Sequence, residues 1–262
     1  MKILKKTYKI LAVLIFNLLI NLPSFSVDKK DVIGVWLFDE GKGDVAKDSS
    51  GNKNDGKLIA SPEWVKNGKF GGCLQYTAAK LHNVRVPVAH SDSLTVAMWA
   101  NYKNLASNNI GLIHIQAGEL DGGNPDTKIV GMWVENSSTL WGRIIPSGAG
   151  KVNFPKNEKL KADTWYHISM VIDSEKKKAT QYVNAKAVGE VEYKGGKLTK
   201  FDFANIGRQG SESWDGLLDE VIIFNKAVST DELKTVMKGI EQNVLSVEAN
   251  DKLAITWAEV KQ

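Results

Sequence analysis

Short apolar runs between turn residues dominate this sequence and restrict what it can fold into. Runs of about six residues, rich in Val, Ile and aromatic side chains, recur between Gly, Asn, Asp and Lys turns. Such spacing is typical of an all-β sandwich or barrel. The last run is the most apolar and is therefore predicted to be central. The predicted strands are 32–38, 84–88, 94–100, 111–116, 129–135, 139–145, 165–173, 180–184 and 217–224.

One helix is predicted close to the C-terminal end of this pattern. Ser229 and Glu232 have the spacing of a capping box, with Ser229 as the N-cap. Leu233, Val236 and Met237 follow at helical spacing. We predict a short amphipathic helix that packs these three apolar side chains onto the end of the sandwich.

Residues 1–26 have the layout of an export signal. Lysines precede the apolar run 10–20, Pro23 follows it, and Ser24 and Ser26 supply small residues before Val27. An uncleaved anchor is the alternative, although the run is shorter than the about 20 residues that a membrane span needs. We expect a secreted protein, extracellular or in the cell envelope, with no membrane span after cleavage. Its parts would be one domain over 27–244 and a tail over 245–262 that forms an edge hairpin.

The charge balance argues against a nucleic-acid partner. The chain has 34 Lys and Arg, and the four lysines in 1–26 leave 30 against 30 Asp and Glu. A nucleic-acid-binding domain normally keeps a large positive excess to neutralise phosphates. Cys73 is the single cysteine, so no internal disulfide forms, and strand alternation predicts that it is a half-buried free thiol.

Several motifs have an informative order along the chain: 36–40 with 48–56, then 68–74, 94–99, 165–168 with 182–184, and 216–221 with 224–233. In this order they resemble the laminin-G-like, concanavalin A-like jelly-roll family, in its bacterial extracellular branch. The resemblance implies an all-β fold of two antiparallel jelly-roll sheets with one short C-terminal helix. Asn184-Ala185 departs from the family's usual Asn-Gly. Because Ala tolerates positive φ poorly, a different turn is expected there.

Residues 48–56 are a candidate calcium loop. Six of its nine residues carry side-chain oxygens, and calcium takes six to eight oxygen ligands. The resemblance implies a structural calcium ion with Asp48 and Asp219 as side-chain ligands. The alternative is a polar turn in which Asp and Asn cap their own backbone.

The sequence has no clear catalytic constellation. Glucanases of this fold class carry three acids on one strand, whereas Glu119 and Asp121 lack a third acid at the required spacing. His167 lies in a predicted strand and is expected to be a hydrogen-bonded structural residue. We expect a non-catalytic protein.

Tryptophans mark the predicted ligand site. Trp133 and Trp141 flank one turn, with Arg143 beyond it, and Trp214 follows a Gly-rich loop. Aromatic faces with planar polar groups suit sugars, so these four residues are predicted to converge on one face or rim; ordinary core packing is the alternative. The predicted function is binding of carbohydrate or a glycosylated surface. A structural or adhesive module that docks onto a protein, and a hydrolase with an unrecognised site, are the alternatives.

Overall fold

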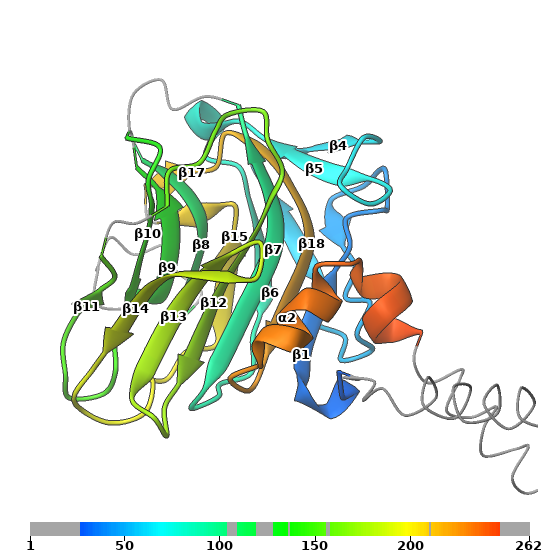
Figure 1. Ribbon diagram of the computed structural model, residues 1–262. Helices are drawn as coiled ribbons and strands as arrows, with labels where there is room; N and C mark the ends of the chain where they lie inside the picture. Colours follow the sequence, from blue (N-terminus) through cyan, green and yellow to red (C-terminus); the bar gives the residue numbers. More distant parts are fainter. Residues whose placement is uncertain are drawn as a thin grey trace, which may run out of the picture.

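The computed structural model describes residues 27–103, 109–118, 128–135, 137–155, 158–209 and 211–246. Two antiparallel sheets pack face to face (Figure 1). The strands are β1 Val32–Trp36, β2 Val45–Ala46, β3 Gly56–Ile59, β4 Glu63–Val65, β5 Cys73–Tyr76, β6 Asn83–Pro87, β7 Leu94–Tyr102, β8 Ile110–Gln116, β9 Lys128–Val134, β10 Leu140–Ile144, β11 Val152–Asn153, β12 Tyr166–Asp173, β13 Lys178–Val183, β14 Lys186–Glu192, β15 Phe203–Ile206, β16 Arg208–Gln209, β17 Glu212–Ser213 and β18 Gly216–Phe224.

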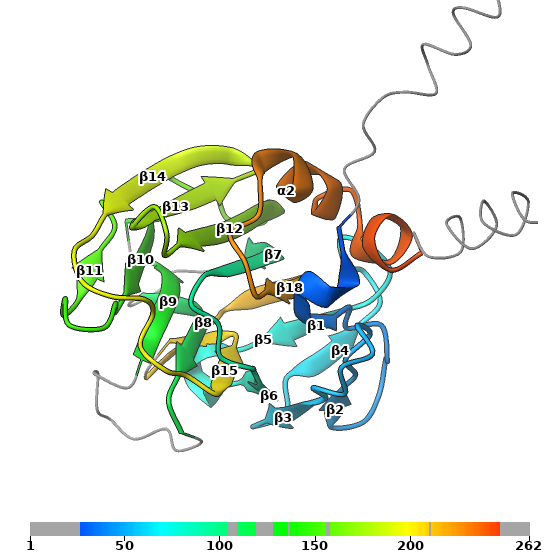
Figure 2. The same cartoon turned by 90° about the horizontal axis from the view of Figure 1, so that it is seen from below.

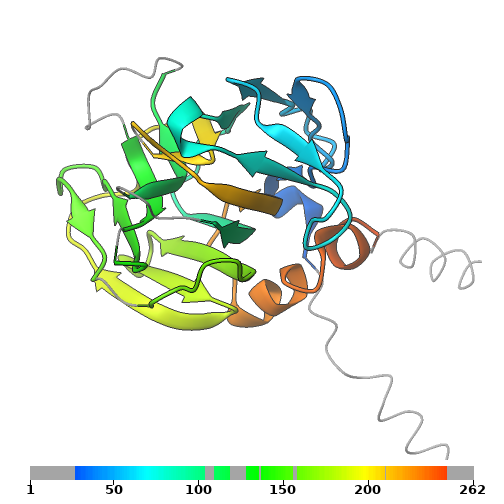
Figure 3. The ribbon, with the colours of Figure 1, turned by 90° about the horizontal axis from the view of Figure 1, so that it is seen from above.

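The strands divide between two large sheets and one small hairpin. Sheet A has the order β14-β13-β12-β7-β18-β5-β4, with β1 also paired to β18. Sheet B has the order β11-β10-β9-β8-β15-β6-β3-β2, and β16 pairs only with β17. Figures 2 and 3, seen from below and from above, show the sheets as two layers with the helix α2 outside sheet A. The predicted two-sheet antiparallel sandwich is confirmed.

The strongest predicted strands are all present. The central position of 217–224 is also confirmed, because β18 lies between β7 and β5 and pairs with β1 as well. Apolar side chains from the inner faces of both sheets fill the space between them, and the largest wholly buried ones include Trp36, Phe38, Tyr76 and Leu74. Burial of this apolar surface is the main term that holds the two layers together.

Helix α2, Thr230–Val236, covers part of the outer face of sheet A. The predicted capping box is present: Ser229 Oγ accepts from Glu232 N at 3.2 Å, and Glu232 Oε2 accepts from Ser229 N at 2.6 Å. Leu233 and Val236 are buried in a second apolar cluster against sheet A, and Met237 packs at its edge. No helix in the described ranges is both long and apolar enough to cross a bilayer.

Three short helical segments join the strands and end the described chain: 3₁₀ turns at Lys29–Asp31 and Ala78–Lys80, and a π-helical turn at Glu241–Leu245. The hairpin predicted over 245–262 is therefore wrong at its first residue, because Leu245 belongs to the π-helical turn and not to a strand. Val244 is buried in the cluster beneath α2, and this burial favours the helical turn. The rest of the predicted hairpin, 247–262, and the predicted signal, 1–26, lie outside the described residues.

The Asn184-Ala185 turn is another correction. It joins β13 to β14 as a two-residue connection between Val183 and Lys186, which pair directly. Asn184 and Ala185 have φ of 50° and 59°, as in the type I′ turn whose twist matches a hairpin. Ala185 thus keeps the geometry that usually selects Gly. Its methyl group is buried in the cluster beneath α2, which offsets part of the strain.

Candidate functional site

The outer face of sheet B carries a line of polar side chains. Strand register places Arg85, Asn205, His114, Gly131 and Arg143 directly beside one another across five strands. The line continues at its ends through Lys57 and Asn153. Along β10, Leu140, Gly142 and Ile144 are buried in the core, and the residues between them point away from it. This polar line therefore lies on the side of sheet B away from the sandwich core.

An indole pair lies beside this line. Trp133 on β9 and Trp141 on β10 are direct cross-strand partners, with ring centroids 4.2 Å apart and ring planes at 81°. Such edge-to-face contacts stabilise aromatic pairs. Trp141 Nε1 donates to the Phe154 carbonyl at 2.7 Å, which fixes its ring. Trp133 is only 3% exposed, whereas Trp141 is partly exposed. The exposed surface of the pair therefore belongs to Trp141, whose ring packs edge-to-face against the buried Trp133.

Arg143 completes a three-residue cluster with the two indoles. Its guanidinium carbon lies 5.7 Å from the ring centroid of Trp133 and of Trp141, within the range of cation–π attraction. Its Nε donates to Asn153 Oδ1 at 2.8 Å. Among the described residues, no Asp or Glu forms an ion pair with Arg143. Three of the four residues predicted as ligand-binding are thus brought together on one face.

Trp214 does not belong to this face, and that part of the prediction is wrong. The residue is 0% exposed and lies in the main core, with its ring edge-on to Tyr102 at 6.3 Å. Its Nε1 donates to the Leu217 carbonyl at 3.2 Å. The hydrogen bond satisfies the buried N–H, so the indole serves as core filling between the sheets.

A buried hydrogen-bond network in the same line was not predicted. Asn205 Oδ1 accepts from Arg85 Nε at 3.2 Å, and Asn205 Nδ2 lies 3.0 Å from His114 Nε2. His114 Nδ1 lies 3.1 Å from the Arg208 carbonyl, which can only accept, so Nδ1 carries a proton. Beside it, Gln116 Nε2 donates to the Gly118 carbonyl at 2.8 Å. These contacts hold the polar side chains in the middle of the face in fixed orientations.

The predicted calcium ligands are already engaged by backbone N–H groups. Asp48 Oδ1 accepts from Val35 N at 3.0 Å and Ser50 N at 2.9 Å, and Oδ2 accepts from Asn54 N at 2.9 Å. This is the capping-turn alternative, in which the carboxylate also fastens the loop to β1. Three N–H donors thus take up most of the acceptor sites of the Asp48 carboxylate.

Asp219 holds a different loop. It is 0% exposed, and its Oδ2 accepts from Lys69 N at 2.7 Å and Phe70 N at 3.0 Å. Burial raises the pKa of the Asp219 carboxyl to about 8, with the neighbouring Glu220 adding to the rise. Across the described ranges, no group of three or more His, Cys, Asp or Glu side chains is placed to hold a metal ion. Asp48 and Asp219 thus each hold a separate loop by accepting from backbone N–H groups.

The residues weighed for catalysis are buried or lie outside the described ranges. His167 is wholly buried and packs edge-on against Trp99 at 5.5 Å, and burial lowers its pKa to about 4. Cys73 is wholly buried rather than half-buried, and burial raises the pKa of its thiol to about 12. Neither is placed to reach a substrate. Glu119 and Asp121 belong to the range 119–127, which the structure does not describe.

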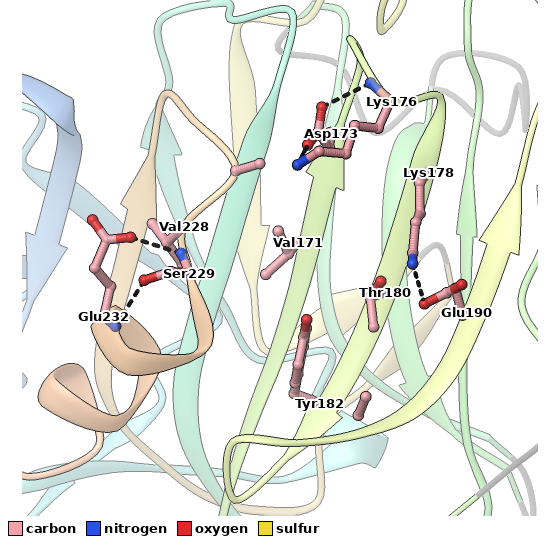
Figure 4. Close-up of a pocket in the computed structure, with 12 residues that line it drawn as sticks. Val171, Asp173, Lys176, Lys178, Thr180, Tyr182, Glu190, Val228, Ser229 and Glu232 are labelled. Carbon is pink, nitrogen blue, oxygen red and sulfur yellow. Dashed lines mark hydrogen bonds and ion pairs between the residues drawn. The ribbon is translucent and has the colours of Figure 1, made fainter.

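A groove of about 390 Å³ lies on the other side of the molecule, between α2 and strands β12 to β14 (Figure 4). Its floor includes Tyr182, and its charged side chains pair with one another. Lys178 Nζ lies 2.7 Å from Glu190 Oε2, and Lys176 Nζ lies 2.9 Å from Asp173 Oδ2. The charges that line this groove are thus largely neutralised within it, in contrast to Arg143.

Comparison with known families matches residues 71–234 to a laminin-G profile of the concanavalin A-like lectin/glucanases superfamily. Comparison with curated proteins gives no match. Solved structures with the same fold include a Trypanosoma rangeli sialidase, at a TM-score of 0.61 and 13% identity over 80% of this chain and 33% of the sialidase.

Two further solved structures are similar. Domain 4 of AbnA, a GH43 extracellular arabinanase from Geobacillus stearothermophilus solved with arabinotriose, gives a TM-score of 0.58 and 15% identity over 79% of this chain and 98% of that domain. The binding domain of Paraclostridial Mosquitocidal Protein 1 gives 0.60 and 14% over 79% of this chain and 51% of that one. The chain thus spans a third of the sialidase and nearly all of the arabinanase domain. These likenesses show the fold.

Proposed function

This chain belongs to the concanavalin A-like lectin/glucanases superfamily, and from that premise we propose that it is an exported, non-catalytic domain that binds carbohydrate on the outer face of sheet B. The match to the family over 71–234 confirms the resemblance that the order of the motifs indicated. A fold of this kind carries many functions, so the proposal depends on the site.

The cluster of Trp133, Trp141 and Arg143 is the observation that carries the proposal. Trp141 presents a partly exposed indole, which is the surface that the apolar C–H face of a sugar ring contacts. Arg143 and the amide of Asn153 stand beside it as planar hydrogen-bonding groups for hydroxyls. A related solved domain is described in complex with arabinotriose, which supports carbohydrate as the ligand class.

The non-catalytic part of the proposal is supported by the placement of the two most strongly perturbed carboxyls. The two most strongly perturbed carboxyls, Asp219 and Glu220, are buried on the outer side of sheet A beneath neighbouring loops. They are adjacent in sequence and bind different backbone segments, so they do not flank a space for a glycosidic bond. Export follows from the sequence of 1–26, and N-terminal sequencing of the protein outside the cell would test it.

Binding of the purified protein to a glycan array, followed by calorimetry on the best ligand, tests the function. We expect Trp141→Ala to abolish measurable binding while the protein stays folded. Tyr182→Ala in the groove beneath α2 is the matched control and should bind as the unaltered protein does. A protein that binds no glycan on the array, or that releases reducing sugar from the ligands it binds, would overturn the proposal.

A further inference from the structure

The charges on the strands of sheet B are all of one sign. None of its eight strands contains Asp or Glu, and the basic residues on them are Lys57, Arg85, Lys128 and Arg143. From this and from the geometry of Arg143 we infer that the carbohydrate bound on this face is acidic, carrying a carboxylate or a sulfate that Arg143 holds. This inference rests on the proposed function and specifies its ligand class.

Arg143 is arranged as an anion receptor. Asn153 Oδ1 engages only Nε, at 2.8 Å, and the guanidinium carbon lies 5.7 Å from the centroid of each indole ring. In the described part of the chain, no ion pair or further hydrogen bond engages its two terminal nitrogens. A guanidinium pairs best with a planar carboxylate or a sulfate through two parallel hydrogen bonds. A partly exposed guanidinium that is held in place but unpaired is suited to such a ligand group.

The spacing along β10 suits one acidic sugar residue. Trp141 and Arg143 are two positions apart on the same strand, so their side chains point the same way and are about 7 Å apart along it. A sugar ring on the Trp141 indole would therefore place a substituent of that ring within reach of Arg143. Trp141 would bind the ring, and Arg143 would select the charge.

Two acidic side chains near this face have other partners. Glu212, on the hairpin β16–β17, accepts from Asn109 Nδ2 at 3.2 Å, and burial raises its pKa. Asp202 accepts from the Gly118 amide. Neither carboxylate therefore competes with a ligand for Arg143.

An acidic glycan fits these observations better than a nucleic acid. Arg143 and Trp141 together resemble a stacking site for a single-stranded base, but such binding also needs a basic groove that follows many phosphates. Outside 1–26 the chain has 30 basic and 30 acidic residues. One fixed guanidinium beside one indole suits a ligand with one acidic group per sugar.

Matched ligand pairs test the inference on the whole purified protein. The pairs are oligogalacturonate against its methyl ester, and a sulfated against a desulfated glycosaminoglycan fragment, so that the two arms separate carboxylate from sulfate. We expect the acidic member of at least one pair to bind about tenfold to a hundredfold more tightly than the neutral one. Its affinity should fall with added salt.

Variants assign this preference to Arg143. Arg143→Gln should remove the difference between the two members of the pair, and Arg143→Lys should keep part of it, because Lys retains the charge without the fork. Lys178→Gln, which removes a paired lysine from the opposite sheet, is the control and should keep the full preference. Melting temperatures of all variants would show that they are folded.

Each of the other possible results would contradict a different part of the inference. Equal or tighter binding of the neutral members would overturn it and leave the proposed function standing. An acid preference that persists in Arg143→Gln would place the anion elsewhere. Binding of a single-stranded oligonucleotide in preference to every glycan would identify nucleic acid as the ligand. Binding of no glycan at all would overturn the proposed function as well.

Discussion

The two sheets of this sandwich differ sharply in the charges that their strands carry. Sheet B has four basic residues and no acid, whereas the strands of sheet A carry Lys178 and Lys186 with six acids, which are Glu63, Asp173, Glu190, Glu192, Asp219 and Glu220. Among the acids of sheet A, Glu190 is paired at the surface and Asp219 is buried with backbone donors. A chain with no net charge outside 1–26 thus has one sheet whose strands carry basic residues alone.

The difference in charge goes with a difference in role: the polar groups of sheet A stabilise the fold, and those of sheet B are available for binding. Sheet A is covered by α2, by the turn Glu241–Leu245 and by the loop at Lys69 and Phe70, so its polar groups serve the fold. On sheet B, Trp141 and Arg143 remain partly exposed. We therefore expect variants of buried groups to change unfolding, and variants at Trp141 or Arg143 to change binding.

The largest expected effect tests that separation with two tryptophans. Trp214→Ala should lower the free energy of unfolding by about 3–5 kcal/mol, because it empties a wholly buried indole site in the core. Trp141→Ala should lower it by no more than about 1–2 kcal/mol, because its indole is partly exposed, and should instead abolish glycan binding. Urea denaturation and calorimetry measure the two effects. Equal destabilisation by both variants would contradict the assignment of the two faces.

The next effect concerns the buried acids of sheet A. Burial raises the pKa of Asp219 to about 8 and that of Glu220 to about 7, so between about pH 4 and pH 8 the folded state binds more protons than the unfolded one. The stability that these groups contribute is present at low pH and is lost as pH rises through 7 and 8. Each group can change the free energy of unfolding by at most about 1.4 kcal/mol per pH unit.

Denaturation at steps from pH 7 to pH 9 measures this loss above the range in which His167 titrates, since its pKa is about 4 when folded. Asp219→Asn should make the slope shallower, because the amide stays neutral and keeps an oxygen for Lys69 and Phe70. Lys178→Gln is the exposed control. A stability that stays constant or rises over this range would show that the two acids are ionised in the fold.

A smaller effect is expected from the cap of the helix that covers sheet A. Ser229→Ala removes the hydroxyl that accepts from Glu232 N and should lower the free energy of unfolding by about 1 kcal/mol. Glycan binding on sheet B should be unchanged. A loss of binding in this variant would mean that the two faces are coupled through the core.

Chelation should have the smallest effect of all. Because three backbone N–H groups engage Asp48 and Asp219 holds another loop, melting curves with chelator and with millimolar calcium should coincide. Asp48→Ala should nevertheless lower the melting temperature, since it frees those N–H groups. A clear rise in melting temperature with calcium, absent in Asp48→Ala, would restore the calcium site that the sequence suggested.

Features that depend on neighbouring residues could be predicted from the sequence, whereas features that depend on residues far apart in the sequence could not. The apolar strand Leu94–Tyr102, predicted over 94–100, and the capping box at Ser229 follow from local patterns. Strands of two residues, such as Val45–Ala46, are too short to show any period. The contact of His114 with Asn205 depends on the register of strands some ninety positions apart, which no local pattern encodes.

The candidate site shows the same division. Trp141 and Arg143 share a face because of simple alternation, and Trp133 joins them across a hairpin, so their convergence could be predicted. Trp214 follows a loop of similar composition, yet its ring enters the core beside Tyr102. Whether an aromatic residue next to a loop turns inward depends on the space left by distant strands. The composition of the loop gives no information about how much core space the distant strands leave.

The place of β18 has a consequence for how the chain matures. Residues 216–224 supply the strand that pairs with β1, β5 and β7, so sheet A lacks its middle until nearly the whole described chain has been synthesised. Pairing between residues this far apart is intrinsically slow. A nascent chain therefore cannot complete sheet A for most of its synthesis. The late arrival of β18 delays completion of the sandwich until the last described segments are available.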